Sequence, residues 1–132
     1  MYRLVYMSTP TRRLSGEELR VILAAATKNN DHNEITGILI QDSKRFLQYL
    51  EGNETLVEQT FARISMDTRH HAIFRLKSGL IVRRQFPGWS MASKTVDQSG
   101  SLTDVVRELV KGCDRDVAEE LLKFAAARDR AA

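Results

Sequence analysis

Hydrophobic and polar positions alternate at the start of the chain and then change to a helical period. Residues 2–7 alternate between two faces, which predicts a β-strand. After a loop, Ser15 and Glu18 have the spacing of a capping box, so a helix is expected to begin there. Its apolar residues recur every three or four positions, and it is expected to end near residues 28–30. This apolar stripe consists of Leu19, Ile22, Leu23 and Ala26.

The following residues are predicted to form two hairpins on either side of a second helix. Short runs of aliphatic and aromatic residues, bounded by turn residues, are typical of strands. The expected elements are strands over 36–41 and 45–52 joined by a turn at residues 42 and 43, a helix over about 55–66 with Val57, Phe61 and Ile64 on its apolar side, and strands over 73–76 and 81–86 joined around residues 78 and 79.

This order of elements, βαββαββ, predicts an α+β fold of ferredoxin-like character. With right-handed crossovers it forms a sandwich, with a five-stranded mixed sheet and two helices on one face. After a polar linker over residues 94–100, two amphipathic helices are expected within residues 101–127, the first capped by Ser101. This helical hairpin is too short to fold alone, so it is expected to cover the opposite face of the sheet or to contact another subunit. We therefore expect two parts, residues 1–96 and residues 97–132.

Composition limits the class of protein. With 132 residues and 15.0 kDa, the chain is long enough for one domain with a core of its own. Cys113 is the only cysteine, which excludes an intrachain disulfide and a cysteine-based zinc site. The net charge of +3 comes from scattered basic residues rather than from one stripe, so nucleic acid is not expected as a partner. No apolar run is long enough for a membrane span and no signal peptide is visible, so we expect a cytoplasmic protein.

One polar residue is out of place in the second strand of the first hairpin. Gln48 lies among Phe46, Leu47, Tyr49 and Leu50, so its carboxamide is expected to lose water on folding. An unpaired buried amide costs roughly 1–3 kcal/mol, so partners must meet both its oxygen and its NH2 group. Taken alone, Gln48 could simply satisfy backbone groups in the core.

Other polar or aromatic residues stand near the expected elements, and each has an ordinary structural explanation. Tyr6 could be a strand aromatic, and residues 29–30 could end the first helix. Arg63 and Asp67 are four positions apart and could form a surface ion pair worth a few tenths of a kcal/mol. Trp89 could belong to the core.

Together these residues and their neighbours form six motifs whose order and spacing are similar to those of the BLUF family. Members of this family are blue-light receptor domains that bind flavin. The resemblance covers Met1 to about Ser93 and leaves the last two helices as the short C-terminal extension of single-domain members. The motifs are Leu4-Val-Tyr6-Met-Ser8, Asn29-Asn30, Ile35-Thr-Gly37, Phe46-Leu-Gln48-Tyr-Leu-Glu-Gly52, Arg63-Ile-Ser-Met-Asp67-Thr-Arg-His70 and Trp89-Ser-Met91.

The resemblance implies a cofactor and a set of residues around it. The expected cofactor is FAD, with FMN or riboflavin as alternatives, held between the first two helices above the sheet. Tyr6 matches the photochemical electron donor, and Gln48 matches the amide that bridges this tyrosine to the flavin. The positions that match flavin contacts or that surround Gln48 are Ser8, Asn29, Asn30, Arg63, Asp67, His70, Trp89 and Met91.

The resemblance also implies a mechanism and an output. Light would drive electron and proton transfer from Tyr6 to the flavin, and the hydrogen bonds of Gln48 would then rearrange. The change would pass through the fifth strand, which is expected to carry Trp89 and Met91, to the C-terminal helices. Because no effector domain is visible, the chain is not expected to be an enzyme. It is expected to signal through a homo-oligomer or through an unidentified partner protein.

Two other classes of function remain open on the residues alone. A small hydrolase of ferredoxin-like fold could use Arg63, Asp67, His70 and His71, although the sequence offers no nucleophile, and the adjacent histidines lack the spacing of metal ligands. The other alternative is a light-independent module that binds a ligand or nucleic acid. A flavin absorption spectrum that shifts reversibly under blue light distinguishes the photoreceptor from both.

Overall fold

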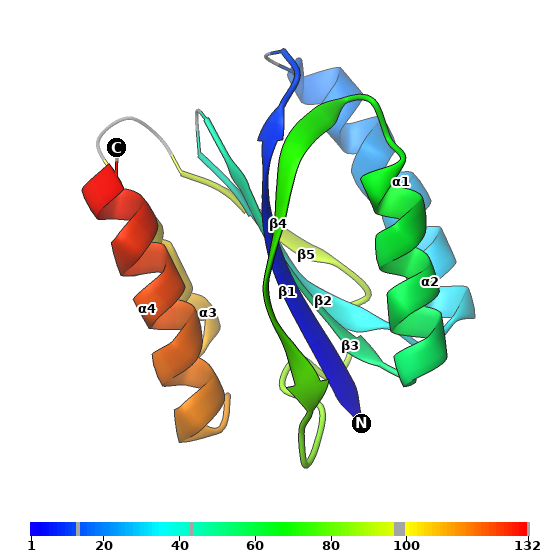
Figure 1. Cartoon of the computed structure of the whole chain (residues 1–132), viewed down its shortest axis with the longest axis vertical. Coiled ribbons are helices and arrows are strands. Elements are labelled where there is room, and N and C mark those ends of the chain that lie inside the picture. The colour runs from blue at the N-terminus through cyan, green and yellow to red at the C-terminus, as the bar shows by residue number, and fades with distance from the viewer. Residues whose placement is uncertain (13, 43, 97–99, 132) are drawn as a thin grey trace.

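A five-stranded sheet separates two pairs of helices, so the chain forms three layers (Figure 1). The computed structural model describes residues 1–12, 14–42, 44–96 and 100–131. The elements in chain order are β1 (Tyr2–Pro10), α1 (Gly16–His32), β2 (Thr36–Gln41), β3 (Phe46–Gly52), α2 (Glu54–Ser65), β4 (His70–Leu80), β5 (Ala92–Thr95), α3 (Leu102–Leu109) and α4 (Arg115–Ala131).

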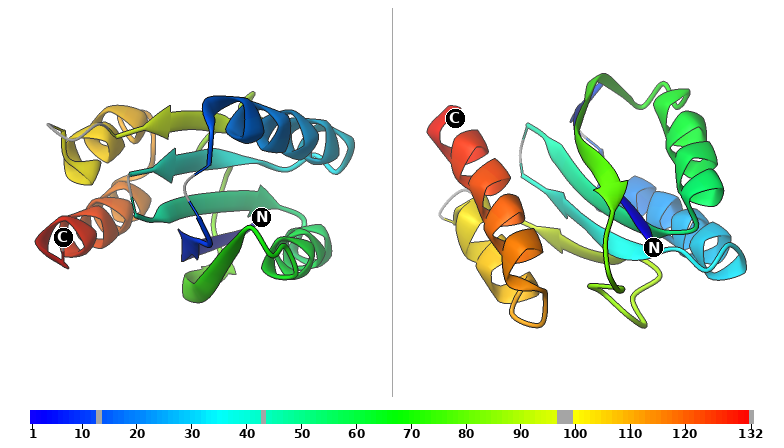
Figure 2. Two further views of the ribbon diagram at one scale, coloured as in Figure 1. Left: turned by 90° about the horizontal axis from the view of Figure 1, so that it is seen from above. Right: turned by 60° about the horizontal axis from the view of Figure 1, so that its bottom comes forward.

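The sheet has the strand order β4-β1-β3-β2-β5, and only β2 and β5 pair in parallel. α1 and α2 lie on one face, whereas α3 and α4 lie on the other (Figure 2). β3 is the central strand, and all seven of its residues are buried because both faces are covered. The predicted α+β sandwich, with a mixed sheet and a helical hairpin on its second face, is confirmed.

The start of α1 follows from its sequence, and its end lies further along the chain than expected. The side chain of Ser15 accepts a hydrogen bond from the N–H of Glu18, whose carboxylate accepts one from the N–H of Ser15, so the predicted capping box is confirmed. The helix continues to His32 instead of ending near residues 28–30, because helical hydrogen bonds persist as far as the N–H of Asn33.

The second predicted hairpin is wrong. One long strand, β4, pairs with β1, and the next strand, β5, pairs with β2 at the far edge of the sheet. Residues 81–91 form no strand, because the N–H groups of Gln85 and Phe86 donate to the carboxylate of Glu51 instead of to a neighbouring strand. The hydrophobicity of Phe86 therefore reflects burial of a loop residue in the core.

The late position of β5 changes two further expectations. Residues 94–95, predicted to belong to a linker, lie in β5. Residues 89–91, predicted to lie on the fifth strand, precede it. The centre of the predicted linker, residues 97–99, and Ser43 of the predicted turn are outside the described residues.

The C-terminal helices form the larger of two cores with the second face of the sheet. Ser101 caps α3, as predicted, by accepting a hydrogen bond from the N–H of Asp104. The apolar stripes of both helices are buried against Val5, Ile40 and Tyr49. From α3 and α4 this core takes Leu102, Val106, Val117, Leu121 and Ala125.

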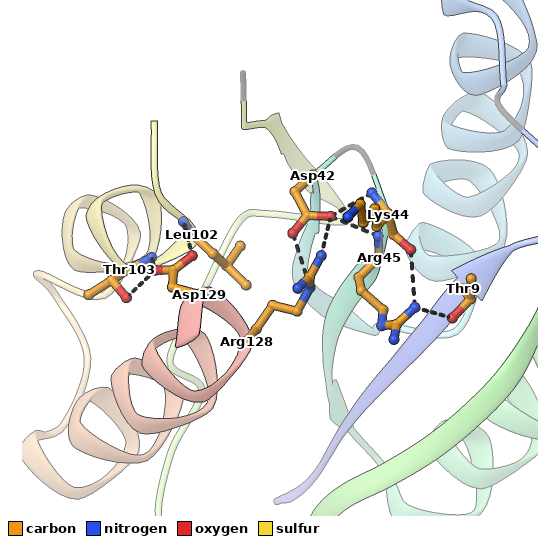
Figure 3. A network of polar contacts seen from close by, with 8 residues as sticks. All are labelled: Thr9, Asp42, Lys44, Arg45, Leu102, Thr103, Arg128 and Asp129. Atoms are coloured by element: carbon orange, nitrogen blue, oxygen red, sulfur yellow. Dashed lines mark hydrogen bonds and ion pairs between the residues drawn. The ribbon is translucent and has the colours of Figure 1, made fainter. Parts of the chain in front are cut away.

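Ion pairs attach α4 to the sheet at two separate points (Figure 3 shows the second). Arg3 of β1 pairs with Glu120, and Arg128 Nε lies 3.2 Å from the Asp42 carboxylate in the β2–β3 turn. The neighbouring Asp129 accepts hydrogen bonds from two N–H groups at the start of α3, which joins the two helices. These contacts hold the helical pair at a defined position on the sheet.

The large apolar side chains that are exposed among the described residues all lie outside α3 and α4. Among the described residues, neither α3 nor α4 therefore exposes a large apolar side chain through which the pair could make the expected contact with another subunit. None of the helices in the described part of the chain has the length and the apolar composition needed to cross a membrane.

Replacing Ala72 by Gly is expected to stabilise the fold. Ala72 has φ of +51°, at the point in β4 where pairing with β1 becomes irregular. A left-handed conformation costs a residue with a Cβ roughly 1–2 kcal/mol, which exceeds the entropy that glycine adds to the unfolded chain. We expect Ala72→Gly to raise the free energy of unfolding by about 0.5–1 kcal/mol in urea denaturation.

The control for this prediction is Ala62→Gly, on the exposed side of α2. Glycine in a helix interior is destabilising by about 1 kcal/mol relative to alanine. Equal losses of stability in both variants would show that the backbone at Ala72 is not strained.

Candidate functional site

The apolar stripe of α1 lines a cavity instead of closing against the sheet. Asn30 is the only buried residue among those of α1, and the predicted stripe is only partly buried. The cavity has a volume of about 580 Å³ when the space at its open mouth is included. Its lining consists of Leu14, Leu19, Ile22, Leu23 and Ala26 from the α1 side, Tyr6, Leu39, Phe46 and Gln48 from the sheet, and Ile64, Asp67, Arg69 and His70 from the end of α2 and the start of β4.

Tyr6 and Gln48 form a buried hydrogen-bonded pair on the sheet side of this cavity. Tyr6 of β1 lies directly opposite Gln48 of β3 in the antiparallel register, and their exposed fractions are 3% and 4%. The Tyr6 hydroxyl donates to Gln48 Oε1, and Gln48 Nε2 donates to Met91 Sδ over 3.4 Å. The prediction that both ends of the amide need partners is confirmed. These partners are side chains rather than backbone groups.

His70 joins β1 to the end of α2 beside this pair. One ring nitrogen, Nε2, lies 2.7 Å from the Ile64 carbonyl oxygen, and the other, Nδ1, lies 2.8 Å from the hydroxyl oxygen of the buried Ser8. A carbonyl only accepts, so Nε2 carries the proton and Nδ1 accepts from Ser8 in the neutral ring. The imidazole is also edge-on to the Tyr6 ring, with centroids 6.4 Å apart.

Asp67 pairs with Arg69 and not with Arg63. α2 ends at Ser65, so Asp67 lies beyond the helix, where helical spacing to Arg63 no longer applies. The Asp67 carboxylate accepts from the backbone N–H of Arg69 at 2.9 Å and from its guanidinium at 2.9 and 3.0 Å. The guanidinium bond is the main cause that lowers the pKa of Asp67. Arg69 also lines the cavity, and sequence reasoning missed it. The available signal was Asp67, because an Asp side chain often accepts a hydrogen bond from the backbone N–H two positions later in a local turn.

The two adjacent asparagines have different environments. Asn30 is buried and its Nδ2 donates to the Ser90 carbonyl at 2.6 Å, whereas Asn29 is exposed. Trp89 is 40% exposed and stacks on Phe86 at a centroid distance of 5.6 Å, so it does not line the cavity. Adjacent residues of one helix point about 100° apart, which is why only one asparagine can face inward.

The structure therefore separates the predicted site residues into two groups. Asn29, Arg63 and Trp89 do not line the cavity. The residues at the cavity, or bonded directly to its lining, are Tyr6, Ser8, Gln48, Asp67, His70 and Met91, while Asn30 is bonded to the segment that carries Met91.

The residues of the alternative hydrolase do not converge. Arg63 and His71 are exposed, and both ring nitrogens of His70 are engaged. Within the described part of the chain, no three His, Cys, Asp or Glu side chains are grouped closely enough to hold a metal ion.

The sequence and the fold both match known proteins. Residues 1–92 match the family described as BLUF, sensors of blue-light using FAD. The chain is 32% identical over 112 residues to the photoactivated adenylate cyclase subunit beta of Euglena gracilis, a match that covers 82% of this chain and only 13% of that subunit. Two solved structures are similar over 98% of this chain at 26% identity. One is the BLUF protein BlrB in its dark state, with a TM-score of 0.71 and 89% of that chain covered. The other is Klebsiella pneumoniae BlrP1 with FMN and cyclic diGMP, with a TM-score of 0.80 and 35% covered.

Tyr6 is expected to resist ionisation and to cause a loss of stability at alkaline pH. Its pKa is raised above 10.0, first by burial and then by the negative charge of Asp67. A raised pKa contributes stability that is complete below the unfolded value and is lost as the pH rises through about 10, since only the unfolded chain ionises.

We expect the Tyr6→Phe variant to lose less stability than the wild-type chain between about pH 9 and pH 11. The difference in slope should approach one proton, or about 1.4 kcal/mol per pH unit, in urea denaturation series. If the free energy of unfolding falls equally with pH in both proteins, Tyr6 ionises in the folded state as it does in the unfolded one.

Proposed function

The chain belongs to the BLUF family of blue-light sensors that use flavin, and from this premise we propose that Tyr6 and Gln48 are its photochemical pair. The observation that carries the proposal is the buried hydrogen bond from Tyr6 to Gln48 at the wall of the cavity lined by α1. Residues 1–96 are proposed as the sensor domain and residues 97–132 as a helical extension of it. The chain matches only 13% of the Euglena subunit, and the cyclase activity in that subunit's name is said of the longer protein.

The cavity suits a flavin ring. BLUF domains bind FAD or FMN, and the ring is planar, aromatic and polar along one edge. The aliphatic side chains of α1 provide one apolar wall, and the opposite side offers the amide of Gln48 and the Asp67–Arg69 pair. Apolar walls with a few convergent polar groups are what such a ligand requires. We propose that Gln48, Asp67 and Arg69 bind its polar edge and that Asn30 supports the site through Ser90.

The flavin, when bound, supplies blue-light absorption and, in its excited state, a strong one-electron oxidant. Loss of an electron makes a phenol strongly acidic. The Tyr6 proton can then move along the existing hydrogen bond to Gln48 Oε1. Both groups are dry, so this bond is stronger than it would be in water.

Gln48 can respond because it is held unequally at its two ends. Its oxygen accepts from a phenol, whereas its NH2 group donates to a thioether, which is a weak acceptor. A carboxamide that turns by half a rotation exchanges its donor and acceptor ends. One that gains the Tyr6 proton on oxygen would do the same by giving a nitrogen proton to the bound flavin. Either change alters what Gln48 offers to Met91 and to the cavity.

The output is proposed to leave the site through Met91. This residue lies directly before β5, which pairs with β2 at the edge of the sheet. Ala92, the first residue of β5, packs against the core formed with α3 and α4. The proposed receiver is a partner protein or a second copy of the chain, in the cytoplasm. Because the light-absorbing site and the receiver are separate in this proposal, a chain without its partner should keep its photochemical response.

Gln48→Leu is expected to bind flavin and to lose the spectral response. The variant keeps a similar volume but has no groups to exchange, and Tyr6→Phe should also lose the normal response because it has no phenol proton. The measurement is the absorption spectrum of the purified yellow protein before and after blue light, with Gln41→Leu on β2 as the control that keeps the shift. A normal reversible shift in Gln48→Leu would overturn the assignment, and the absence of a shift in the wild-type protein would overturn the function.

Asp67→Ala and Asn30→Ala are expected to weaken flavin binding, whereas their matched controls are not. Asp67→Ala removes a group proposed to bind the polar edge of the flavin, and Asn30→Ala removes the bond to Ser90 that supports the site. Each loss should cost about 1–3 kcal/mol, which corresponds to roughly a tenfold to hundredfold rise in Kd. The controls are Arg63→Ala and Asn29→Ala, whose side chains are exposed. The measurement is titration of each apoprotein with FMN, followed by flavin fluorescence. Equal affinities for FMN in all four variants would show that the polar edge of the flavin binds elsewhere in the cavity.

A further inference from the structure

The segment between β4 and β5 contacts both layers of helices. We define the connecting segment as residues 83–91. At its end, Met91 accepts the hydrogen bond from Gln48 in the candidate flavin site. Near its start, Gln85 contacts Asp114, the residue that precedes α4. One short stretch of chain therefore lies between the site and the C-terminal helices.

A buried carboxylate attaches the start of the connecting segment to the central strand. Glu51 is fully buried at the end of β3 and accepts the N–H groups of Gln85 and Phe86, both at 2.8 Å. The hydroxyls of Thr36 and Tyr49 complete its shell at 2.8 and 3.0 Å. A carboxylate that receives four donors in a dry site holds them in a narrow range of positions.

Gln85 uses both ends of its amide to contact the start of α4. Its Oε1 accepts from the N–H of Asp114 at 2.6 Å, and its Nε2 donates to Asp114 Oδ2 at 3.0 Å. Gln85 is almost fully buried, at 5% exposed, so water competes little for these bonds. Arg83 also pairs with Asp114, but its side chain is well exposed, and exposed pairs contribute little.

The residues between Gln85 and Met91 leave little freedom for independent movement. Phe86 is buried, packs edge-on against Tyr49 at a centroid distance of 5.1 Å and stacks on Trp89. The carbonyl of Trp89 accepts from the N–H of Gly37 at 2.9 Å, and that of Ser90 accepts from Asn30. A displacement of Met91 is therefore passed along a packed segment, because close-packed interiors transmit strain.

We propose that Gln85 is the positioning residue through which a rearrangement of Gln48 reaches the start of α4, with Glu51 as the fixed anchor. This inference rests on the proposed photochemical function. Two other buried ion pairs also attach α4. Arg3 with Glu120 joins it to β1, and Arg128 with Asp42 joins it to the β2–β3 turn (Figure 3). Neither involves a residue bonded to Gln48, so they hold α4 in place while the contact at Asp114 changes.

The test combines two readouts on the full chain loaded with FMN. The absorption shift under blue light reports the site, and hydrogen exchange of the amides of residues 115–121 reports the start of α4. In the wild-type protein, light is expected to change both. In Gln85→Leu the absorption shift should persist, while the light-dependent difference in exchange should be lost. The control Arg83→Leu, which removes only the exposed pair, should keep both responses.

Exchanging the amide and the carboxylate between positions 85 and 114 tests the contact between Gln85 and Asp114 itself. Gln85→Glu places two carboxylates together and should lose the response of α4 to light. Combining it with Asp114→Asn restores an NH2 group opposite a carboxylate oxygen and should recover that response. A folding defect in Gln85→Leu therefore does not remove the test.

The results separate this inference from the function on which it rests. A wild-type light response of α4 that is unchanged in Gln85→Leu, or an absorption shift with no response of α4 in the wild-type protein, overturns the inference alone. If the wild-type protein shows no absorption shift, the photochemical function fails. The coupling is then judged in darkness by whether FMN protects residues 115–121 from exchange in the wild-type chain but not in Gln85→Leu. Equal effects in both proteins overturn it.

Discussion

A carboxamide buried on the central strand must find a partner for each of its ends, and this requirement organises the site. Gln48 lies on β3, where both faces of the sheet are covered, so an unmet amide group would carry its full desolvation cost. The antiparallel register places Tyr6 directly opposite, as a donor to the oxygen. Met91, from a segment far along the chain, supplies a weak acceptor for the NH2 group. The amide is therefore satisfied and at the same time held loosely enough at one end to change its bonds.

The alternation of side chains along β3 connects this site to the opposite face. Gln48 and Leu50 lie on the side of the cavity and the smaller core, whereas Tyr49 packs into the core formed with α3 and α4. Glu51 bonds to Tyr49 and to the backbone of the connecting segment, on the same side. Because successive residues of a strand point to opposite faces, four consecutive positions serve both layers.

α1 has a different role from the other helices. Its caps define its start, but its apolar stripe is only partly buried and forms one wall of the cavity. A planar ligand that covers such a wall gains roughly 25 cal/mol for each Å² of apolar surface it removes from water. The same hydrophobic period that would stabilise a packed helix thus serves as binding surface. Periodicity reports which side of a helix avoids water, and it does not report whether protein or ligand covers that side.

The amino-acid sequence by itself determined the local and periodic features. Capping residues, strand alternation and helical stripes predicted the α+β sandwich and the hairpin on its second face, because these signals depend on neighbours within one turn or one strand. The need of Gln48 for two partners was predictable for the same reason, since burial of an amide follows from the residues beside it. The resemblance of six motifs also indicated the family before any geometry was known.

Contacts between distant residues were decided only by the tertiary structure. Residues 81–86 have the composition of a strand, yet they form a loop. The carboxylate of Glu51, more than thirty positions earlier, accepts the N–H groups of Gln85 and Phe86. Asn29 and Asn30 are equivalent in sequence, and only the packing of α1 selects the second as the buried one. Asp67 pairs with Arg69 because α2 ends two residues earlier, a boundary that propensity places poorly. Each outcome depends on which donor meets which acceptor in three dimensions, and residue types along the chain do not contain that information.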